Sequence, residues 1–425
     1  MTLHLLAWVL GGDEGTAGTS GLWMPWLPPA TATYGLEGHI YPGRYQINVR
    51  WLRIVPYLQE LGVEVRHVPW SAGISLEERL CHVKAAMEWA DVVWMRGSEV
   101  ISWLCGDCEW EFGRGRGTPY EHYAKGHRVF PDNLEARGLW AEVQVRKRLG
   151  LVVDADDMPA ELPAWWIKQH PTQLGNPIRE ADLVTVATPA LARMARRYSA
   201  RVRVIPNAVS ASWYLADQPR PDGPTRLVWY GAADRQRDYT GRTLFPNERA
   251  SYCRQAVEDN RADLRTIYIG SNPLDPEGAL RMRQAGFDEV HPSAGWRKFP
   301  HILGNSWPEI GVAPLIITPW RSAKSEMHWL ELSVAGAAVV AERWPGGPGP
   351  YDVIRDGVDG FLAHGRQEWS DAIGRLARSP QLRADIGGAA RERMATEYDP
   401  HQRAEELRDA YLWAANHAGI NRGSA

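Results

Sequence analysis

The stretch SAKSEMHWLELSVAGAAVVAE, residues 322–342, decides the fold because it joins a helix pattern to a buried strand. Its end, AAVVAE (337–342), has the short apolar run of a strand inside a parallel sheet. The helix pattern before it carries Lys324, Glu326 and Glu331 among apolar residues. Charged side chains in such surroundings are rarely buried without a partner. This pattern favours a binding element, and the alternative is an amphipathic helix with a solvent-exposed charged face.

Similar strand and helix patterns alternate along most of the chain. Strands are predicted at 4–10, 63–68, 91–95, 149–155, 182–188, 202–207, 226–232, 264–271, 309–315, 337–342 and 360–363. Helices are predicted at 46–61, 75–89, 134–148, 189–198, 247–259, 277–285, 324–335, 367–377, 380–396 and 400–417. This alternation predicts right-handed β-α-β units and an α/β fold with two Rossmann-like, doubly wound halves.

A segment rich in Pro, Gly and Asp, residues 211–225, separates the two series and is predicted to be a linker. We expect an amino-terminal domain over 1–210 and a carboxyl-terminal domain over 226–399. Ligands of open parallel sheets bind outside the carboxyl ends of the strands, so a cleft between the two halves is the expected binding place.

The composition narrows the classes of protein to which the chain can belong. The 425 residues exceed what one hydrophobic core holds, and a net charge of −3 provides no overall field for nucleic acid or membrane, although it allows a local basic patch. Four cysteines do not make a disulfide framework. The opening MTLHLLAWVLGG predicts a strand and not a signal peptide, and no apolar run is long enough to span a membrane. We expect a cytoplasmic protein.

Three segments carry a resemblance to a known family. They are the run from EIGVAPL to VIRDGVDGFL (309–362) with its KSEMHWLELSVAG helix (324–336), the segment 180–209 with its PNAV turn, and the tail 379–411. In this order they resemble GT-B glycosyltransferases of family four, which retain anomeric configuration. The resemblance implies a GT-B fold and transfer of sugar from a nucleotide-diphosphate sugar to a hydroxyl. It also implies a last helix within 400–425 that crosses back toward the first domain.

The resemblance assigns roles in the helix at 324–335. Glu331 takes the place of the glutamate that accepts hydrogen bonds from the ribose hydroxyls, and Lys324 is placed to reach a phosphate oxygen. The helix start offers the backbone N–H groups of Ser325 and Glu326. A second family glutamate, which helps to hold the donor sugar, is replaced by Ala323, and Glu326 is a candidate substitute.

Two glycine-containing turns are further candidates for donor binding. Gly231 ends the strand at 226–232 and permits close backbone approach, and the resemblance implies that Arg235 and Arg237 behind it neutralise the leaving diphosphate. A solvated loop of mixed charge is the alternative. Gly12 lies in the glycine-rich loop GGDEGTAGTSG (11–21), which follows the first strand.

An aspartate cluster ends the strand at 149–155. Asp156 and Asp157, with Asp154, are candidates to orient an acceptor hydroxyl, to act as a base or to bind a divalent ion. Some phage-encoded members of the family have a similar DxDD pattern; the alternative is a pair of loop-capping aspartates. The implied retaining mechanism lets the leaving phosphate deprotonate the acceptor, so a catalytic metal is not expected.

The segment 97–135 has no counterpart in the family and is interpreted as an insertion. It contains Cys105, Cys108, His122 and His127, whose spacing fits a structural zinc site. The alternative is chance proximity of a CxxC pair to two histidines. Basic and aromatic residues beside this set fit either contact with nucleic acid or an acceptor loop.

The acceptor therefore stays open between a glycan, a small molecule and a hydroxymethylated base in DNA, the last suggested by the phage-like aspartate pattern. A non-catalytic sugar-nucleotide-binding protein is the rival from another class, suggested by Ala323 at the place of the first glutamate.

Overall fold

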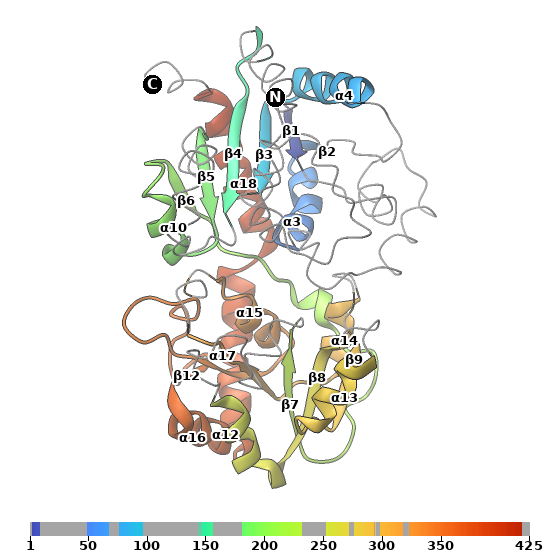
Figure 1. The fold of residues 1–425 in the computed structure, drawn as a ribbon, viewed down its shortest axis with the longest axis vertical. Helices are drawn as coiled ribbons and strands as arrows, with labels where there is room; N and C mark the ends of the chain where they lie inside the picture. Colours follow the sequence, from blue (N-terminus) through green and yellow to red (C-terminus); the bar gives the residue numbers. More distant parts are fainter. Residues whose placement is uncertain are drawn as a thin grey trace, which may run out of the picture. The chain divides into compact units, whose positions relative to one another are not determined.

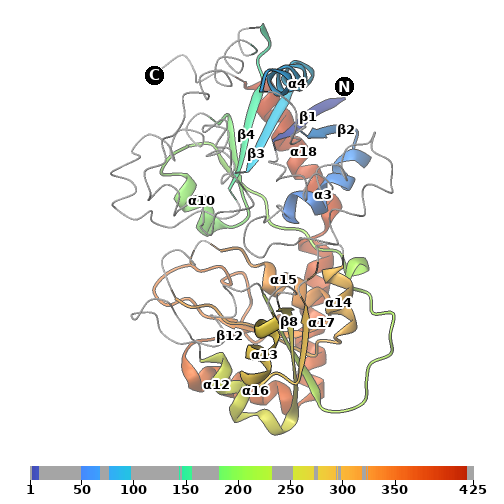
Figure 2. The same cartoon turned by 45° about the vertical axis from the view of Figure 1, so that its right-hand side comes forward.

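The computed structural model describes residues 2–8, 49–67, 76–96, 143, 146–155, 181–231, 252–271, 276–292, 294, 298–317, 322 and 324–418. Two parallel six-stranded sheets form the centres of two compact units (Figures 1 and 2). Described residues up to 205 and from 404 onward belong to the first unit, and those of 206–403 to the second.

The first sheet has the strand order β2-β1-β3-β4-β5-β6. Its strands are β1 (Leu3–Trp8), β2 (Val63–His67), β3 (Val92–Arg96), β4 (Gly150–Ala155), β5 (Leu183–Val186) and β6 (Val202–Val204). Its helices are α3 (Val49–Glu60), α4 (Leu76–Trp89), α10 (Pro189–Ala195) and, from the end of the chain, α18 (Pro400–Asn416). A Cβ atom on Gly150 would lie 2.8 Å from the Ala414 carbonyl, so the last part of α18 lies against the beginning of β4 at backbone contact distance. Figure 1 shows α18 behind this strand.

The second sheet has the order β12-β11-β10-β7-β8-β9. Its strands are β7 (Thr225–Tyr230), β8 (Leu264–Ser271), β9 (Glu289–Pro292), β10 (Ile310–Ala313), β11 (Ala338–Glu342) and β12 (Phe361–Ala363). Its helices are α12 (Cys253–Asp259), α13 (Pro276–Gln284), α14 (Phe299–Asn305), α15 (Met327–Val334), α16 (Gly365–Arg378) and α17 (Pro380–Glu397), with the short 3-10 turns η1 (Ala211–Tyr214) and η2 (Arg261–Asp263).

Helices cover both faces of this second sheet, and β7 contributes to both cores because successive side chains point to opposite faces. Leu227 and Trp229 pack in one buried cluster with residues of α12, α13 and α16. Val228 and Tyr230 pack in the other with residues of α14 and α15. Tyr230, the last residue of β7, is thereby directed to the α15 face.

The predicted α/β class with two doubly wound halves is confirmed, and a strand lies at every predicted position. Two elements, β9 and α14, were missed. β9 is a short edge strand of partly exposed residues, and α14 has only seven residues, so neither carries a long apolar period. The helix predicted at 134–148 lies mostly outside the described residues. Within the described part of the chain, no helix is both long and apolar enough to cross a membrane.

Four acidic residues fasten neighbouring strands at the amino edges of the two sheets. Each lies one position before a strand, and its carboxylate accepts the N–H of a residue near the start of the adjacent strand. The pairs are Asp91 with His4 (2.9 Å), Asp182 with Leu151 (2.8 Å), Asp288 with Thr266 (2.7 Å) and Glu309 with Arg226 (3.1 Å). In every pair the N–H of the acid donates to the carbonyl of the same partner, at 2.8–3.0 Å. We call this two-point contact the acid clamp.

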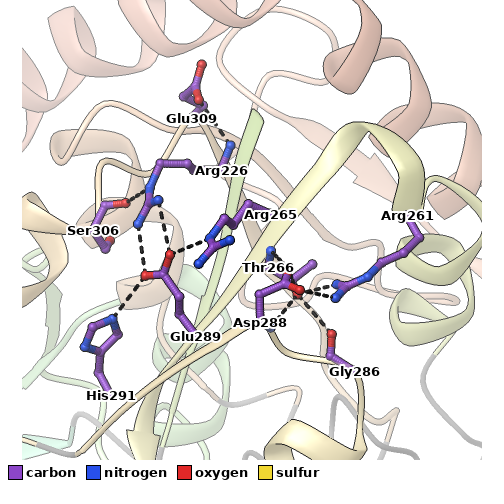
Figure 3. Close-up of polar contacts among 10 residues, drawn as sticks. All are labelled: Arg226, Arg261, Arg265, Thr266, Gly286, Asp288, Glu289, His291, Ser306 and Glu309. Atoms are coloured by element: carbon purple, nitrogen blue, oxygen red, sulfur yellow. Dashed lines mark hydrogen bonds and ion pairs between the residues drawn. The ribbon is translucent and has the colours of Figure 1, made fainter. Parts of the chain in front are cut away.

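Ion pairs surround the two clamps of the second sheet (Figure 3). The guanidinium of buried Arg226 contacts both oxygens of Glu289, at 3.2 and 3.3 Å, and its Nε donates to the Ser306 carbonyl at 2.7 Å. Arg265 donates to Glu289 at 2.7 Å. Burial by itself raises the pKa of Glu289, but the hydrogen bonds and charges of Arg265 and Arg226 outweigh it and lower that pKa. Glu289 therefore stays ionised and links β7 to β8 and β9.

Loss of one clamp carboxylate is expected to destabilise the first unit. Asp182→Ala leaves the buried N–H of Leu151 without its side-chain acceptor, which costs about 1–3 kcal/mol. Asp182→Asn keeps one acceptor oxygen and should recover part of that loss. Chemical denaturation monitored by circular dichroism measures both. Asp371→Ala, on an exposed carboxylate of α16, is the control and should change stability by less than about 0.5 kcal/mol; equal effects of the two alanine variants would contradict the clamp.

Candidate functional site

The candidate site in the second unit is built from the carboxyl end of β7, the turn η1 and the start of α15. The helix begins at Met327 with Glu326 at its N-cap, so the prediction that Lys324 lies in the first helical turn is wrong. Glu326 is 1% exposed, and its Oε1 accepts from Asn207 Nδ2 at 3.4 Å. Lys324 and Ser325 precede the helix in an irregular, half-buried segment.

Glu331 lies in the second turn of α15 and is 6% exposed. Its Oε1 accepts a hydrogen bond from the Tyr214 hydroxyl at 3.0 Å. Its Oε2 accepts one from the Tyr230 hydroxyl. Because both donors are neutral, the carboxylate is held in a fixed orientation without an ion pair among these contacts.

Aromatic contacts fix the ring of Tyr230. It stacks on His328 with ring centroids 4.3 Å apart, and Phe299 packs against it at 4.8 Å. The Nε2 atom of His328 lies 3.2 Å from the Tyr230 carbonyl oxygen. Burial, followed by the charge of Glu331, raises the pKa of Tyr230 well above its ordinary value. The phenol therefore keeps its proton and acts as a donor across the working pH range.

Gly231 follows Tyr230 and lies against the end of β8. Its N–H donates to the Ile269 carbonyl at 3.0 Å, and its carbonyl accepts from the Tyr268 hydroxyl at 2.8 Å. Gly270 has φ +130°, and a Cβ atom there would lie 2.1 Å from the Gly231 carbonyl oxygen. A glycine at 270 is thus required both by the backbone conformation and by the close approach of the two strand ends.

Two matched substitutions separate these requirements. Gly270→Ala should displace the Gly231 backbone and cost more than about 1 kcal/mol of stability, because a clash adds to backbone strain. Gly223→Ala carries nearly the same strain, with φ +131°, but no atom lies within 4 Å of the added methyl. Urea denaturation should therefore rank Gly270→Ala as the more destabilised variant. Equal losses would mean that the close approach contributes nothing.

The structure shows Asp154 as a buried acid of β4 that is hydrogen-bonded to a neighbouring strand. It is 2% exposed, and its Oδ1 accepts from the Thr185 hydroxyl of β5 at 2.5 Å. The other residues predicted for catalysis, donor binding or zinc lie outside the described residues: Gly12, Cys105, Cys108, His122, His127, Asp156, Asp157, Arg235 and Arg237. Within the described ranges, no three His, Cys, Asp or Glu side chains are grouped as metal ligands would be.

A second buried carboxylate lies at the carboxyl ends of β11 and β12. Glu342 is 3% exposed; its Oε1 lies 2.9 Å from His364 Nδ1 and its Oε2 accepts from the Trp369 indole at 3.2 Å. Burial raises the pKa of Glu342 from 4.5 to about 7, although His364 and Trp369 act in the opposite direction. Burial and the charge of Glu342 also raise the pKa of the Cys253 thiol.

This raised pKa predicts a pH dependence of stability. The folded state holds a proton on Glu342 that the unfolded state releases, so the stabilisation is present below pH 4.5 and is lost as the pH rises through about 7. The loss attributable to this group is about 3 kcal/mol. Glu342→Gln should remove it, so the variant gains stability relative to the unmodified chain between about pH 5 and about pH 8. Urea denaturation at several pH values measures this, with Glu392→Gln as an exposed control; parallel profiles for all three chains would contradict it.

Comparison with known proteins agrees with this architecture. Residues 301–409 match a protein family described as glycosyl transferase-like. The Anabaena protein Alr3699/HepE, solved in complex with UDP and glucose, is 12% identical, with a TM-score of 0.56 over 96% of this chain and 99% of its own. A glycosyltransferase from Rickettsia africae is 10% identical, with a TM-score of 0.55 over 98% and 100% of the two chains.

AviGT4, a glycosyltransferase involved in avilamycin A biosynthesis, is 15% identical, with a TM-score of 0.52 over 98% of this chain and 99% of its own. No curated protein sequence matches the chain. At these identities the structural likeness shows the fold, and the family match lies on the unit that contains α15. Together they confirm a GT-B fold, and residues 301–409 are similar to glycosyl transferases.

Sequence reasoning missed the two tyrosines that hold Glu331. Tyr214 lies in the segment interpreted as an unstructured linker, where the structure has the 3-10 turn η1 with Tyr214 buried. Tyr230 was noted only as part of an apolar strand. An aromatic hydroxyl at a strand end, directly before a glycine, is the one signal that could have indicated it.

Proposed function

We propose that the protein transfers a sugar from a nucleotide-diphosphate sugar to an acceptor hydroxyl with retention of anomeric configuration. The observation that carries this proposal is the buried Glu331 carboxylate in the second turn of α15, with Lys324 and Ser325 just ahead of the helix. The family that the sequence resembles has a glutamate at this place that accepts hydrogen bonds from the ribose hydroxyls, and a carboxylate is a suitable acceptor for such a diol.

Each described candidate has a role in donor binding. Glu331 accepts the ribose hydroxyls, and the Lys324 ammonium neutralises phosphate charge. Backbone N–H groups of Ser325 and Glu326, at the positive end of the α15 dipole, also suit an anion. Gly231 carries no side chain and lets the donor approach the backbone.

The expected chemistry needs no nucleophile from the protein. The bond between the anomeric carbon and the leaving phosphate oxygen breaks, and the acceptor oxygen bonds to the same face of the sugar. The acceptor proton passes to the departing phosphate. Lys324, with Arg235 and Arg237, would stabilise the charge that develops on the leaving group, and Asp156 and Asp157 would orient the acceptor.

Two comparisons support a nucleotide-sugar donor. The matched glycosyl transferase-like family covers residues 301–409, which include α15. The Anabaena protein of the same fold was solved with UDP-glucose as well as with UDP and glucose. UDP-sugars are therefore the first donors to test, followed by sugars of the other nucleoside diphosphates.

Donor hydrolysis and transfer by the purified full chain test the proposal. Glu331→Gln should raise the donor KM about 10- to 100-fold, because a hydrogen-bonded charge is lost. Lys324→Ala should lower kcat about 100-fold, since charge stabilisation on the leaving group is lost. Glu392→Gln and Lys298→Ala, on exposed side chains, are the matched controls.

Two results would decide against the proposal. Turnover by Glu331→Gln and Lys324→Ala equal to that of the unmodified chain would refute the assigned site. Donor binding with no hydrolysis or transfer over hours would favour a binding protein over an enzyme.

A further inference from the structure

A buried acid that the proposed donor site does not use lies at the carboxyl edge of the second sheet. Glu342 is the last residue of β11, and only 3% of its surface is exposed. Earlier residues of the strand show which face it occupies. Val340 packs with residues of α12 and α16, whereas Ala341 packs with residues of α15. Because successive side chains of a strand point to opposite faces, Glu342 points to the face of α12 and α16.

Hydrogen-bonding groups from three separate parts of the fold meet on this carboxylate. His364, directly after β12, places its Nδ1 atom 2.9 Å from Oε1, and the indole of Trp369 on α16 donates to Oε2 at 3.2 Å. The backbone N–H of Leu315, shortly after β10, donates to the carboxylate as well. Glu342 therefore joins the carboxyl ends of β10, β11 and β12 to α16.

Leu315 carries this contact to the opposite face of the sheet. Its side chain is buried in the same cluster as Trp329 of α15 and Tyr230 of β7. The chain then continues to Lys324 and Ser325, the residues proposed to meet the donor phosphates. The Leu315 backbone is thus connected to the start of α15 both by packing and along the chain, so a shift of this backbone would shift the donor site.

Stability alone does not account for an acid at this position. Burial raises the pKa of Glu342 to about 7, even though His364, Trp369 and the Leu315 N–H all act to lower it. The ionised side chain therefore costs free energy on this face, and a neutral side chain of similar size would be more favourable. Proteins retain such costs at functional sites.

The charge on Glu342 determines how strongly it binds Leu315. An ionised carboxylate accepts from all three groups, and such charge-assisted hydrogen bonds are about twice as strong as neutral ones. A protonated carboxyl carries a hydrogen on one oxygen. Among the three partners only the His364 ring can accept that hydrogen, because backbone and indole N–H groups only donate. Protonation therefore preserves the contact with His364 and weakens the contact with Leu315.

Other titratable and charged groups face this pair from the elements packed against it. Within the described residues they are Cys253 and Tyr252 of α12 and its N-cap, Glu368 of α16, Arg343 after β11 and Asp356 before β12. Arg343 is paired with Asp356 at 2.9 Å and with Glu368 at 3.5 Å. Burial and the charge of Glu342 raise the pKa of the Cys253 thiol, which therefore stays neutral. The Glu342 and His364 pair changes its charge beside a neutral thiol and an ion-paired arginine.

We propose that Glu342 is a positioning residue of the donor site, which holds the Leu315 backbone and thereby the start of α15, and that the proton it shares with His364 controls this hold. The inference rests on the proposed nucleotide-sugar function. It requires that Glu342→Gln makes the protein more stable and yet weakens donor binding, because a neutral glutamine removes a buried charge and forms a weaker contact with Leu315.

Donor affinity and stability are measured on the same full chains. UDP-glucose, ADP-glucose and GDP-glucose are titrated by isothermal calorimetry, and the tightest binder is used further. Their diphosphates are esterified at both ends and keep their charge between about pH 6 and about pH 8. Glu342→Gln should weaken binding about 10-fold at about pH 8 while urea denaturation shows a gain in stability. At about pH 6 the two chains should bind within about twofold of each other, because the unmodified carboxylate is then protonated.

His364→Ala tests the shared proton. Burial raises the pKa of Glu342 and His364 opposes this, so loss of the imidazole should raise that pKa further. Donor affinity of this variant should still rise between about pH 7.5 and about pH 9, where the affinity of the unmodified chain has become constant. If Glu342→Gln does not fold by circular dichroism, this profile decides, and a profile identical to that of the unmodified chain would refute the proposal.

Two controls separate positioning from a loss of structure. Asp288→Asn weakens an acid clamp at the amino edge, so it should lower stability and leave donor affinity unchanged. Glu392→Gln removes an exposed charge from α17 and should change neither property. The inference is overturned if Glu342→Gln binds the donor as tightly as the unmodified chain at about pH 8. It is also overturned if weaker binding is accompanied by lower stability, since a merely structural role has that result.

The inference and the proposed function fail in different ways. Binding of none of the three sugar nucleotides by the unmodified chain would overturn the proposed function and the inference with it. Sugar transfer by a Glu342→Gln chain whose donor affinity equals that of the unmodified chain would leave the function standing and refute the positioning role.

Discussion

The acid clamp is the contact on which the rest of the fold depends. It joins side chain and backbone of one residue to the backbone of a neighbouring strand, and it recurs at Asp91, Asp182, Asp288 and Glu309. A register shift by one residue would turn every buried side chain of a strand to the opposite face. Because the clamps fix the amino end of each clamped pair of strands, the length of a strand determines the position of its carboxyl end. On β7 this places Tyr230 toward α15 and Gly231 against Gly270.

Acidic residues serve two purposes in this protein, and their partners distinguish the two groups. The clamp acids and Asp154 accept hydrogen bonds from backbone or hydroxyl groups of adjacent strands. These hydrogen bonds stabilise the sheet. Glu331 lies on α15 and Glu342 is the last residue of β11, and their neighbours are tyrosine, histidine and tryptophan. The raised pKa of Glu342 and the fixed orientation of Glu331 are features typical of functional sites.

The sequence predicts the fold well because the signal for a buried parallel strand is strong. Runs such as LGLVVDA and AAVVAE have few alternative interpretations, whereas β9 is short and partly exposed and α14 has only seven residues. Glu331 was identifiable because it interrupts an apolar helix. Its partners were not, since Tyr214 lies 117 residues away and no local pattern encodes such a contact. The helix α15 begins at Met327, later than the sequence pattern predicts, and the contact of Glu326 with Asn207 is a tertiary feature that no local pattern encodes.

The route of the chain through its two units has a consequence for biosynthesis. Residues from 404 onward belong to the first unit, and the α18 backbone at Ala414 touches the beginning of β4 at Gly150. During synthesis, the first sheet therefore forms before α18 exists, because α18 is made only after the whole second unit. Until then one flank of that sheet is uncovered, so the nascent chain presents apolar surface to chaperones while the later-made unit can already close.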